Sequence, residues 1–368
     1  MRKVGYLVFC LIVLPAAPLL SAGATQYKIH VLDTPPGQSY SAAHRINDQG
    51  VIAGVAAFEY SGRSQGGVYY WNTTGVHYAG FVLRKYGLVG LNNSGTIVGS
   101  RFVSSNSTLA TLPTLLPTYG HNELADINDA GIIVGGSVYV DPYHYYHATL
   151  WDGAGIHDLG ALEGDVESLA SGVNDLGQAV GWSENPLGFR ARRGVLWENG
   201  SKTQLDPLPG YDASSALRIN NLGQVVGASS KWAIYYYAGS EHKYLREEAV
   251  LWWNGATVDV ASEGLNTVGA DINDLGQVVG YAYSYPDEHG HRPFLWEDGA
   301  LTWLDGPGGD SIALGINENG WIVGRAFGTD RNWHAVVWEP IVPEPSSLLA
   351  LAFALSGLGC VLVRRRHR

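Results

Sequence analysis

Cysteine is almost absent from this sequence. Among 368 residues the cysteines are Cys10 and Cys360, and there is a single methionine. Both cysteines fall in apolar segments near the two ends, so the body of the chain has no disulfide framework, no thiolate nucleophile and no cysteine-based zinc site. Any stability or chemistry in the body must come from other side chains.

Basic residues are also scarce. The chain has 23 Lys and Arg against 34 Asp and Glu, a net charge of −11, and residues 25–342 alone reach −16. A nucleic-acid partner is excluded, because neutralising phosphates needs a basic surface. The H-E-x-x-H, P-loop, C-x-x-C and EF-hand patterns are missing as well, so no catalytic residue, metal or cofactor is predicted.

Glycine and aromatic residues, in contrast, are plentiful. There are 48 glycines and 12 tryptophans, and only 15% of the residues are charged. The hydrophobic fraction of 46% is enough to build a core. This composition favours β structure with many turns.

Residues 1–24 have the three parts of a secretory signal peptide. The positive pair Arg2-Lys3 precedes an apolar run at 4–20, and residues 22–24 (AGA) fit an A-x-A cleavage site. The segment predicts export, with an uncleaved membrane anchor as the alternative.

Residues 343–368 have the composition of a membrane anchor. The tripeptide Pro343-Glu344-Pro345 leads into a 16-residue apolar run (348–363), which we expect to be a transmembrane segment although it is slightly short for a full span. The cluster Arg364-Arg365-Arg366 follows and is expected on the cytoplasmic side. By physical chemistry alone, this is the C-terminal anchor of an exported protein.

The order Pro-Glu-Pro, apolar segment, arginine cluster resembles the PEP-CTERM sorting signal of Gram-negative bacteria. The resemblance implies an exosortase as processing partner and removal of the tail after transient anchoring in the inner membrane. It also implies delivery to the cell surface or extracellular matrix, usually in bacteria that make exopolysaccharide. A retained anchor is the alternative to processing.

One nine-residue element recurs seven times, as in INDAGIIVG (127–135) and INDLGQVVG (272–280). Asparagine suits the first position of a type I turn, and the glycine three places later suits the left-handed residue after it, so each copy predicts a hairpin with a G1 bulge. A second glycine, four places further on, is expected to mark close backbone approach or a bend. The turn asparagines are Asn47, Asn92, Asn128, Asn174, Asn220, Asn273 and Asn317, and the turn glycines include Gly50, Gly131, Gly177, Gly223, Gly276 and Gly320.

The residue after each turn asparagine is usually a carboxylate, which suggests a metal site. The residues at this position are Asp48, Asn93, Asp129, Asp175, Asn221, Asp274 and Glu318. Calcium needs six to eight oxygen ligands around one point. Because we expect the copies to lie on separate blades, each turn supplies too few ligands, and a structural role is predicted.

A second element ends in a tryptophan in six copies. The tryptophans are Trp71, Trp151, Trp197, Trp252, Trp296 and Trp338. Their strand runs into another glycine turn and a further strand, so each full copy makes four short strands. The recurrent aromatic residue is expected to pack between copies. The second copy is irregular, with 36 residues and no tryptophan.

Four strands in roughly 45 residues are typical of a β-propeller blade. The last copy ends at its third strand, whereas IHVLD (29–33) matches the fourth strand of another copy, IHDLG (156–160). We therefore predict that residues 25–342 form an all-β, seven-bladed β-propeller whose N-terminal strand closes the last blade. A β-solenoid or paired β-sandwiches are the alternatives.

The units also resemble the HAF family of probable extracellular repeats, named after a His-Ala-Phe sequence before the tryptophan. His147-Ala148 and His334-Ala335 keep the first two positions, whereas Arg292-Pro293-Phe294 and Gly194-Val195 depart from them. The resemblance covers nearly all of 25–342. It implies an extracellular repeat protein without an established activity.

The connections between the second and third strands are rich in aromatic residues and vary most in length. They open on one face of a propeller, because successive strands of a blade run antiparallel. Sugar rings stack on aromatic side chains while polar groups bind their hydroxyls, so we predict ligand binding there. The alternative is that these tyrosines only shield strand edges. The candidate ligand-binding residues are Tyr143, Tyr145, Tyr146, Trp232, Tyr235, Tyr236, Tyr283, Tyr285 and Trp333.

The sequence therefore predicts an exported, non-catalytic protein of the cell surface or extracellular matrix that binds exopolysaccharide or another surface component. One alternative is a glycan-active hydrolase or lyase. It requires two carboxylates, for example from among Asp141, Glu241 and Glu288, or a His–Tyr pair in one pocket. A purely structural or protein-binding propeller is the other alternative, and a flat face without a cleft is then expected.

Overall fold

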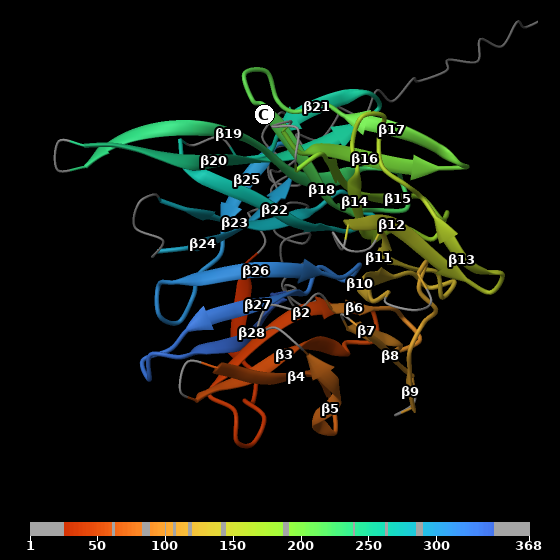
Figure 1. Ribbon diagram of the computed structural model, residues 1–368. Coiled ribbons are helices and arrows are strands. Elements are labelled where there is room, and N and C mark those ends of the chain that lie inside the picture. Colours follow the sequence, from red (N-terminus) through yellow and green to blue (C-terminus); the bar gives the residue numbers. More distant parts are fainter. Residues whose placement is uncertain are drawn as a thin grey trace, which may run out of the picture.

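The computed structural model describes residues 26–60, 63–82, 89–99, 101–105, 108–116, 120–140, 145–186, 191–237, 240–261, 264–284 and 290–341. This part of the chain contains 28 strands and no helix. The strands form seven four-stranded antiparallel sheets, and the first strands of neighbouring sheets contact each other around a closed ring (Figure 1). The predicted all-β, seven-bladed β-propeller is confirmed.

Each blade is described from its innermost strand outward. Blade one contains β2 (Tyr40–Ile46), β3 (Ile52–Tyr60), β4 (Arg63–Asn72) and β5 (Gly75–Val82). Blade two contains β6 (Val89–Leu91), β7 (Ile97–Gly99), β8 (Phe102–Ser105) and β9 (Thr108–Ala110). Blade three contains β10 (Asn122–Ile127), β11 (Ile133–Val140), β12 (Tyr145–Asp152) and β13 (Gly155–Asp158). Blade four contains β14 (Glu167–Val173), β15 (Ala179–Glu184), β16 (Arg193–Glu198) and β17 (Ser201–Leu205). Blade five contains β18 (Ala213–Ile219), β19 (Val225–Tyr237), β20 (Ser240–Trp253) and β21 (Ala256–Asp259). Blade six contains β22 (Asn266–Ile272), β23 (Val278–Tyr283), β24 (Arg292–Glu297) and β25 (Ala300–Trp303). Blade seven contains β26 (Ser311–Ile316), β27 (Ile322–Phe327), β28 (Trp333–Pro340) and, as its outermost strand, β1 (Tyr27–Val31).

The last blade is closed by the N-terminal strand, as predicted. β1 pairs antiparallel with β28, in the register Tyr27 to Pro340 through Val31 to Val336. The short second copy also forms a complete blade, because β6, β7, β8 and β9 pair in order although they have only three or four residues each.

The Asn–Gly element makes the turn between the first and second strands of each blade. In the turn after β2, the Gly50 N–H donates to the Asn47 oxygen at 3.0 Å and the Asn47 N–H donates to the Val51 oxygen at 3.0 Å. Gly50 has φ 75°, a left-handed conformation that strains any residue with a Cβ. This is the type I turn with a G1 bulge.

The second glycine of the element allows the second strand to approach a bulge in the first. A Cβ on Gly181 would lie 2.0 Å from the Leu169 oxygen of the neighbouring strand, and the pairing of β14 with β15 shifts between Ala170 and Gly172. The same shift occurs in every blade but the second. The glycine is therefore required by backbone packing beside a β-bulge.

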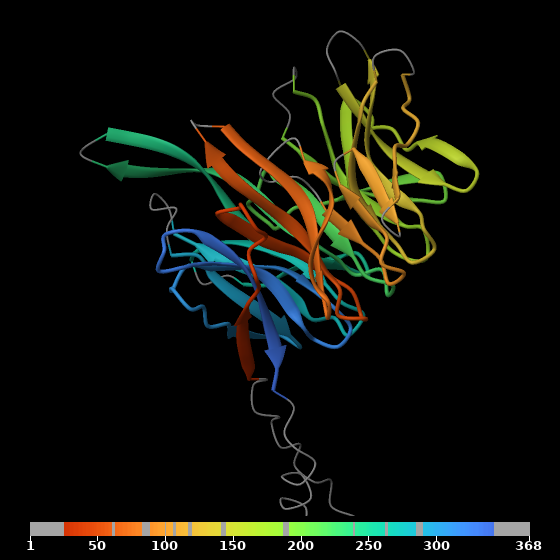
Figure 2. The ribbon, with the colours of Figure 1, turned by 90° about the horizontal axis from the view of Figure 1, so that it is seen from below.

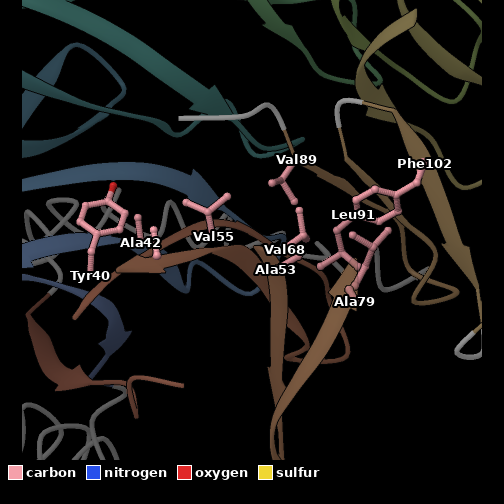
Figure 3. Close-up of a cluster of buried hydrophobic side chains, with 11 residues drawn as sticks. Tyr40, Ala42, Ala53, Val55, Val68, Ala79, Val89, Leu91 and Phe102 are labelled. Carbon is pink, nitrogen blue, oxygen red and sulfur yellow. The ribbon is translucent and has the colours of Figure 1, made fainter. Parts of the chain in front are cut away.

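Apolar side chains between neighbouring blades form the core. Figure 3 shows one such cluster, in which Val55 and Val68 of the first blade pack with Val89, Leu91 and Phe102 of the second. Tryptophans of the third strands add a hydrogen bond between blades. The indole N–H of Trp252, for example, donates to the Asp206 oxygen of the preceding blade at 2.7 Å.

The two faces of the disc differ. The face with the Asn–Gly turns is called the turn face here, and the face with the connections between second and third strands is called the loop face. Tyr27 and Pro340 pair near the turn face, and the Ile341 N–H donates to the Gln26 oxygen at 2.7 Å, so both described ends leave from that face. In Figure 2, the start of β1 and the end of β28 lie at the bottom of the molecule, whereas the β19–β20 hairpin of the loop face points to the left.

No helix among the described residues is long and apolar enough to cross a membrane. The segments on which the export and sorting predictions rest, 1–24 and 343–368, lie outside the described residues.

Candidate ligand-binding channel

The seven turn asparagines form a closed ring of hydrogen bonds around the propeller axis. Each Nδ2 donates to the backbone oxygen of the asparagine in the next blade, for example from Asn47 to Asn92 at 3.1 Å, and Asn317 returns to Asn47 at 3.0 Å. The side chains are 2–5% exposed. Each Oδ1 accepts a backbone N–H of its own turn, such as that of Val51 at 2.9 Å. The asparagine thus joins its own turn to the next blade.

The residues after these asparagines form a second ring at the mouth of the channel. The backbone N–H of each donates to the side chain at the same position in the next blade, from Asp48 to Asn93 at 2.9 Å through to Glu318, which returns to Asp48 at 3.0 Å. The copies lie on separate blades, as expected, but their turns meet around the propeller axis, so these residues contact each other from blade to blade. No group of three or more His, Asp or Glu within the described ranges is arranged to hold a metal ion.

The next layer toward the loop face is made of two arginines, two aspartates and three glycines. Two places before the turn asparagine, the blades carry in ring order Arg45, Gly90, Asp126, Gly172, Arg218, Asp271 and Gly315. Each charged side chain satisfies the backbone of a neighbouring blade. Asp126 accepts the Val173 N–H at 3.3 Å, and the Arg45 Nη1 donates to the Leu314 oxygen at 3.0 Å. The layer therefore has a structural role in closing the ring.

Burial raises the pKa of Asp126 to about 7, and the Asp271 carboxylate adds to the rise while Arg45 opposes it. The unfolded chain releases this proton near pH 4, so between about pH 4 and 7 the folded state holds a proton that the unfolded state has lost. The contribution of Asp126 to stability is therefore greatest in acid and decreases as pH rises through this interval.

We expect Asp126→Asn to flatten this pH dependence. The amide oxygen can still accept the Val173 N–H, and the variant should gain about 4 kcal/mol over the parent between pH 4 and pH 8, since each pKa unit corresponds to about 1.4 kcal/mol. Urea unfolding at a series of pH values measures the difference. Asp129→Asn, at an exposed ring carboxylate, is the control for losing one negative charge. An unchanged slope for Asp126→Asn would contradict the assignment.

On the other side of this layer, toward the loop face, lies a chamber of about 480 Å³. Arg45 and Arg218 line both the chamber and the cavity of about 320 Å³ at the turn face. The remaining chamber residues are His44, Val89, Glu123, Leu169, Ser171, Trp182, Leu217, Val268, Ala270, Tyr281, Leu314 and Arg325. Burial lowers the pKa of His44 to about 3, helped by the positive charges of Arg45 and Arg325, so this imidazole is neutral.

An aromatic cluster lies beside the chamber, on blades six and seven. Tyr281 of the chamber wall lies 6.2 Å from Tyr283 and 5.8 Å from His291 between ring centroids. His291 in turn lies 6.2 Å from Trp333, whose ring is 4.7 Å from the Arg325 guanidinium. The cluster joins the chamber to the loop face.

Tyr283 and Trp333 are the predicted ligand residues that the structure brings together, through His291. Trp232 lies on the β19–β20 arm and is 69% exposed, opposite Leu245. Tyr145 and Tyr146 stand on β12 in a half-buried setting, and Tyr146 is hydrogen-bonded to His121. Tyr235 and Tyr236 lie on β19, and only their backbone is described; Tyr143 and Tyr285 fall outside the described residues.

Sequence reasoning missed the residues that line the chamber. Trp182, Tyr281 and Arg325 each come directly after the second glycine of their repeat. Because alternate residues of a strand face opposite sides, the residue directly after this glycine faces the chamber in these repeats. Its fixed position in the repeat could have been used to predict the chamber wall.

No family model matches the chain, and no curated protein matches it. Among solved structures, the chain is similar to the β-propeller domain of the Trilobed protease from Pyrococcus furiosus, with a TM-score of 0.53, 12% identity, and coverage of 82% of this chain and 96% of that one. It is also similar to Pyrococcus horikoshii acylaminoacyl peptidase, with a TM-score of 0.50, 13% identity, and coverage of 84% of this chain and 53% of that one. At these identities the similarity establishes the fold alone. The first domain is described as having an open velcro topology, whereas β1 and β28 close the ring here.

Proposed function

We propose that this chain is an exported, non-catalytic binding propeller whose loop face recognises a polysaccharide at the cell surface. One observation carries the proposal: a chamber of about 480 Å³ on the axis opens beside the cluster of Tyr281, Tyr283, His291 and Trp333. Ligand pockets commonly have volumes of roughly 300–1,000 Å³. A purely structural propeller is expected to have a flat face instead.

The chemistry of the wall suits a sugar. Trp182 and Tyr281 present aromatic rings on which the C–H face of a pyranose can stack. Glu123, Ser171 and the neutral His44 offer groups that bind hydroxyls. Leu169 and its apolar neighbours exclude water from the contact.

The position of the chain ends supports display of this face. The chain leaves the turn face at Ile341, and the predicted transmembrane segment begins at residue 348. The six intervening residues span at most about 20 Å when fully extended. Insertion of the tail, before or without exosortase processing, thus turns the chamber away from the membrane.

We expect Trp182→Ala and Tyr281→Ala each to weaken polysaccharide binding about 10-fold, because each removes a stacking surface. Affinity electrophoresis of the purified protein in gels that contain acidic or neutral polysaccharides measures the effect. Trp253→Ala is the matched control, since Trp253 is 47% exposed at the end of β20 on the turn face. If no polysaccharide retards the parent protein, the proposal is wrong. An equal effect of Trp253→Ala would place the site elsewhere.

A second candidate is a polysaccharide lyase. The observation that favours it is that His44 and Tyr281 line one chamber with three arginines. In such a reaction a base removes the C5 proton of a uronate, the C4–O4 bond breaks, a C4–C5 double bond forms and the leaving oxygen takes up a proton. Among the described residues Glu123 is the one carboxylate of the chamber wall, so a hydrolase with two carboxylates finds less support. Ultraviolet absorbance of the unsaturated product tests for lyase activity.

A further inference from the structure

We infer that the chamber recognises the carboxylate of an acidic sugar, a uronic acid residue. The inference deepens the proposed function and rests on it. It starts from a contrast in charge. Residues 25–342 have a net charge of −16, yet Arg45, Arg218 and Arg325 all line this one cavity.

Arg45 and Arg218 are held in place by hydrogen bonds that use only part of each guanidinium. The Arg45 Nη1 donates to the oxygens of His44 at 2.7 Å and Leu314 at 3.0 Å, and the Arg218 Nη1 donates to the oxygens of Leu217 and Ser171. Within the described chain, all hydrogen bonds of these two guanidiniums come from Nη1, and each Nε is buried without a partner. Anchored guanidiniums that line a cavity and keep unused donors are preorganised to bind a planar carboxylate.

The third arginine is positioned by aromatic rings. The Arg325 guanidinium lies over Trp333, and its Nη1 donates to the Tyr40 hydroxyl at 2.6 Å. This arrangement places its charge between the aromatic cluster and the chamber. An acidic sugar can therefore stack on the rings while its carboxylate meets the guanidinium.

The described wall of the chamber itself carries one opposing charge. Glu123 is the only carboxylate of the described chamber wall, and His44 is neutral. Asp126 and Asp271 share a layer with Arg45 and Arg218, but they line the cavity at the turn face and not the chamber. The chamber therefore has an excess of positive charge in an otherwise acidic protein.

The apolar wall argues for a ring rather than a small inorganic anion. Leu169, Leu217, Val268 and Leu314 line the chamber together with Trp182. The four aliphatic side chains offer no hydrogen bonds but pack against the C–H groups of a pyranose. A uronic acid residue combines such a face with a carboxylate.

Calorimetry on the purified full chain tests the inference with two matched ligands, trigalacturonic acid and its carboxyl-reduced form, trigalactose. We expect the acid to bind about 10- to 100-fold more tightly, and its advantage to shrink as salt rises. Arg325→Gln should remove most of the difference. Arg292→Gln should retain it, since the Arg292 guanidinium is an exposed partner of Trp303 outside the chamber.

Each result decides between the claims. Equal affinity for the two trisaccharides overturns the carboxylate inference and leaves the binding function standing. Tighter binding of a sulfated trisaccharide of equal charge also overturns it. If neither trisaccharide binds while a neutral polysaccharide retards the protein, the inference fails alone. If no polysaccharide of either kind is bound, the proposed function fails too. The ligand comparison needs no variant, so a misfolded Arg325→Gln protein cannot obscure it.

Discussion

Deleting residues 26–31, and with them β1, is expected to unfold the propeller. The deletion exposes the whole edge of β28, from Val336 to Pro340, and removes Tyr27 and Ile29 from the cluster around Trp338. Backbone hydrogen bonds contribute about 1 kcal/mol each and buried apolar side chains roughly 1.5–3 kcal/mol each. The loss should exceed about 5 kcal/mol, which equals the whole stability of many domains. Circular dichroism with urea unfolding measures it.

Two controls separate ring closure from trimming of an end. Truncation after Ile341 leaves every described strand in place and should not change the unfolding free energy. Adding a synthetic peptide of residues 26–33 to the deleted protein should restore the native spectrum, because the peptide can pair with β28 in the same register. A deletion variant that unfolds at the same urea concentration as the parent would show that the ring does not depend on this strand.

The architecture could be predicted because each repeat carries its own turn chemistry. Asparagine and glycine at fixed spacing predict the first hairpin of a blade, and all seven of these turn glycines have φ between 75° and 81°. The closing strand could be found because residues 29–33 match a fourth strand that the last repeat lacks. The turn residues and the repeated strands predict the same architecture, so the fold could be predicted from a single sequence.

The channel could not be predicted because a bulge interrupts the alternation of the first strand in every blade but the second. The shift between Ala216 and Arg218 in β18 places Leu217 and Arg218, which are consecutive in sequence, on the same cavity. Simple alternation assigns neighbouring residues to opposite faces. For the same reason, three arginines from the first, fifth and seventh blades gave no pattern in the sequence.

The aromatic residues of the loops show a different limit. Their presence on one face follows from strand direction, but their mutual distances depend on hairpin length. Tyr283 and Trp333 lie close to the ends of their strands, and both contact His291. Trp232, in contrast, lies on the long β19–β20 hairpin and is 69% exposed. The repeat pattern predicts the position of residues near the strand ends, but it does not predict the position of residues far along an extended hairpin.

The second large effect is expected from Asn220→Ala, in the ring of asparagines on the axis. Asn220 is 4% exposed; its Oδ1 accepts the Gln224 N–H at 2.9 Å, and its Nδ2 donates to the Asn273 oxygen at 2.9 Å. Alanine leaves these buried groups without partners, and each unsatisfied group costs about 1–3 kcal/mol. The variant should lose about 3–5 kcal/mol in urea unfolding.

The neighbouring residue is the matched control, because it differs in burial and not in kind. Asn221 is half-buried, and its Nδ2 donates to the carboxylates of Asp175 at 3.1 Å and Asp274 at 3.0 Å at the mouth of the channel, where water can replace it. Asn221→Ala should therefore cost no more than about 1 kcal/mol. Equal losses for the two variants would mean that the asparagine ring adds nothing beyond an ordinary turn. A large difference would show that stability depends on the bonds that pass from blade to blade around the axis.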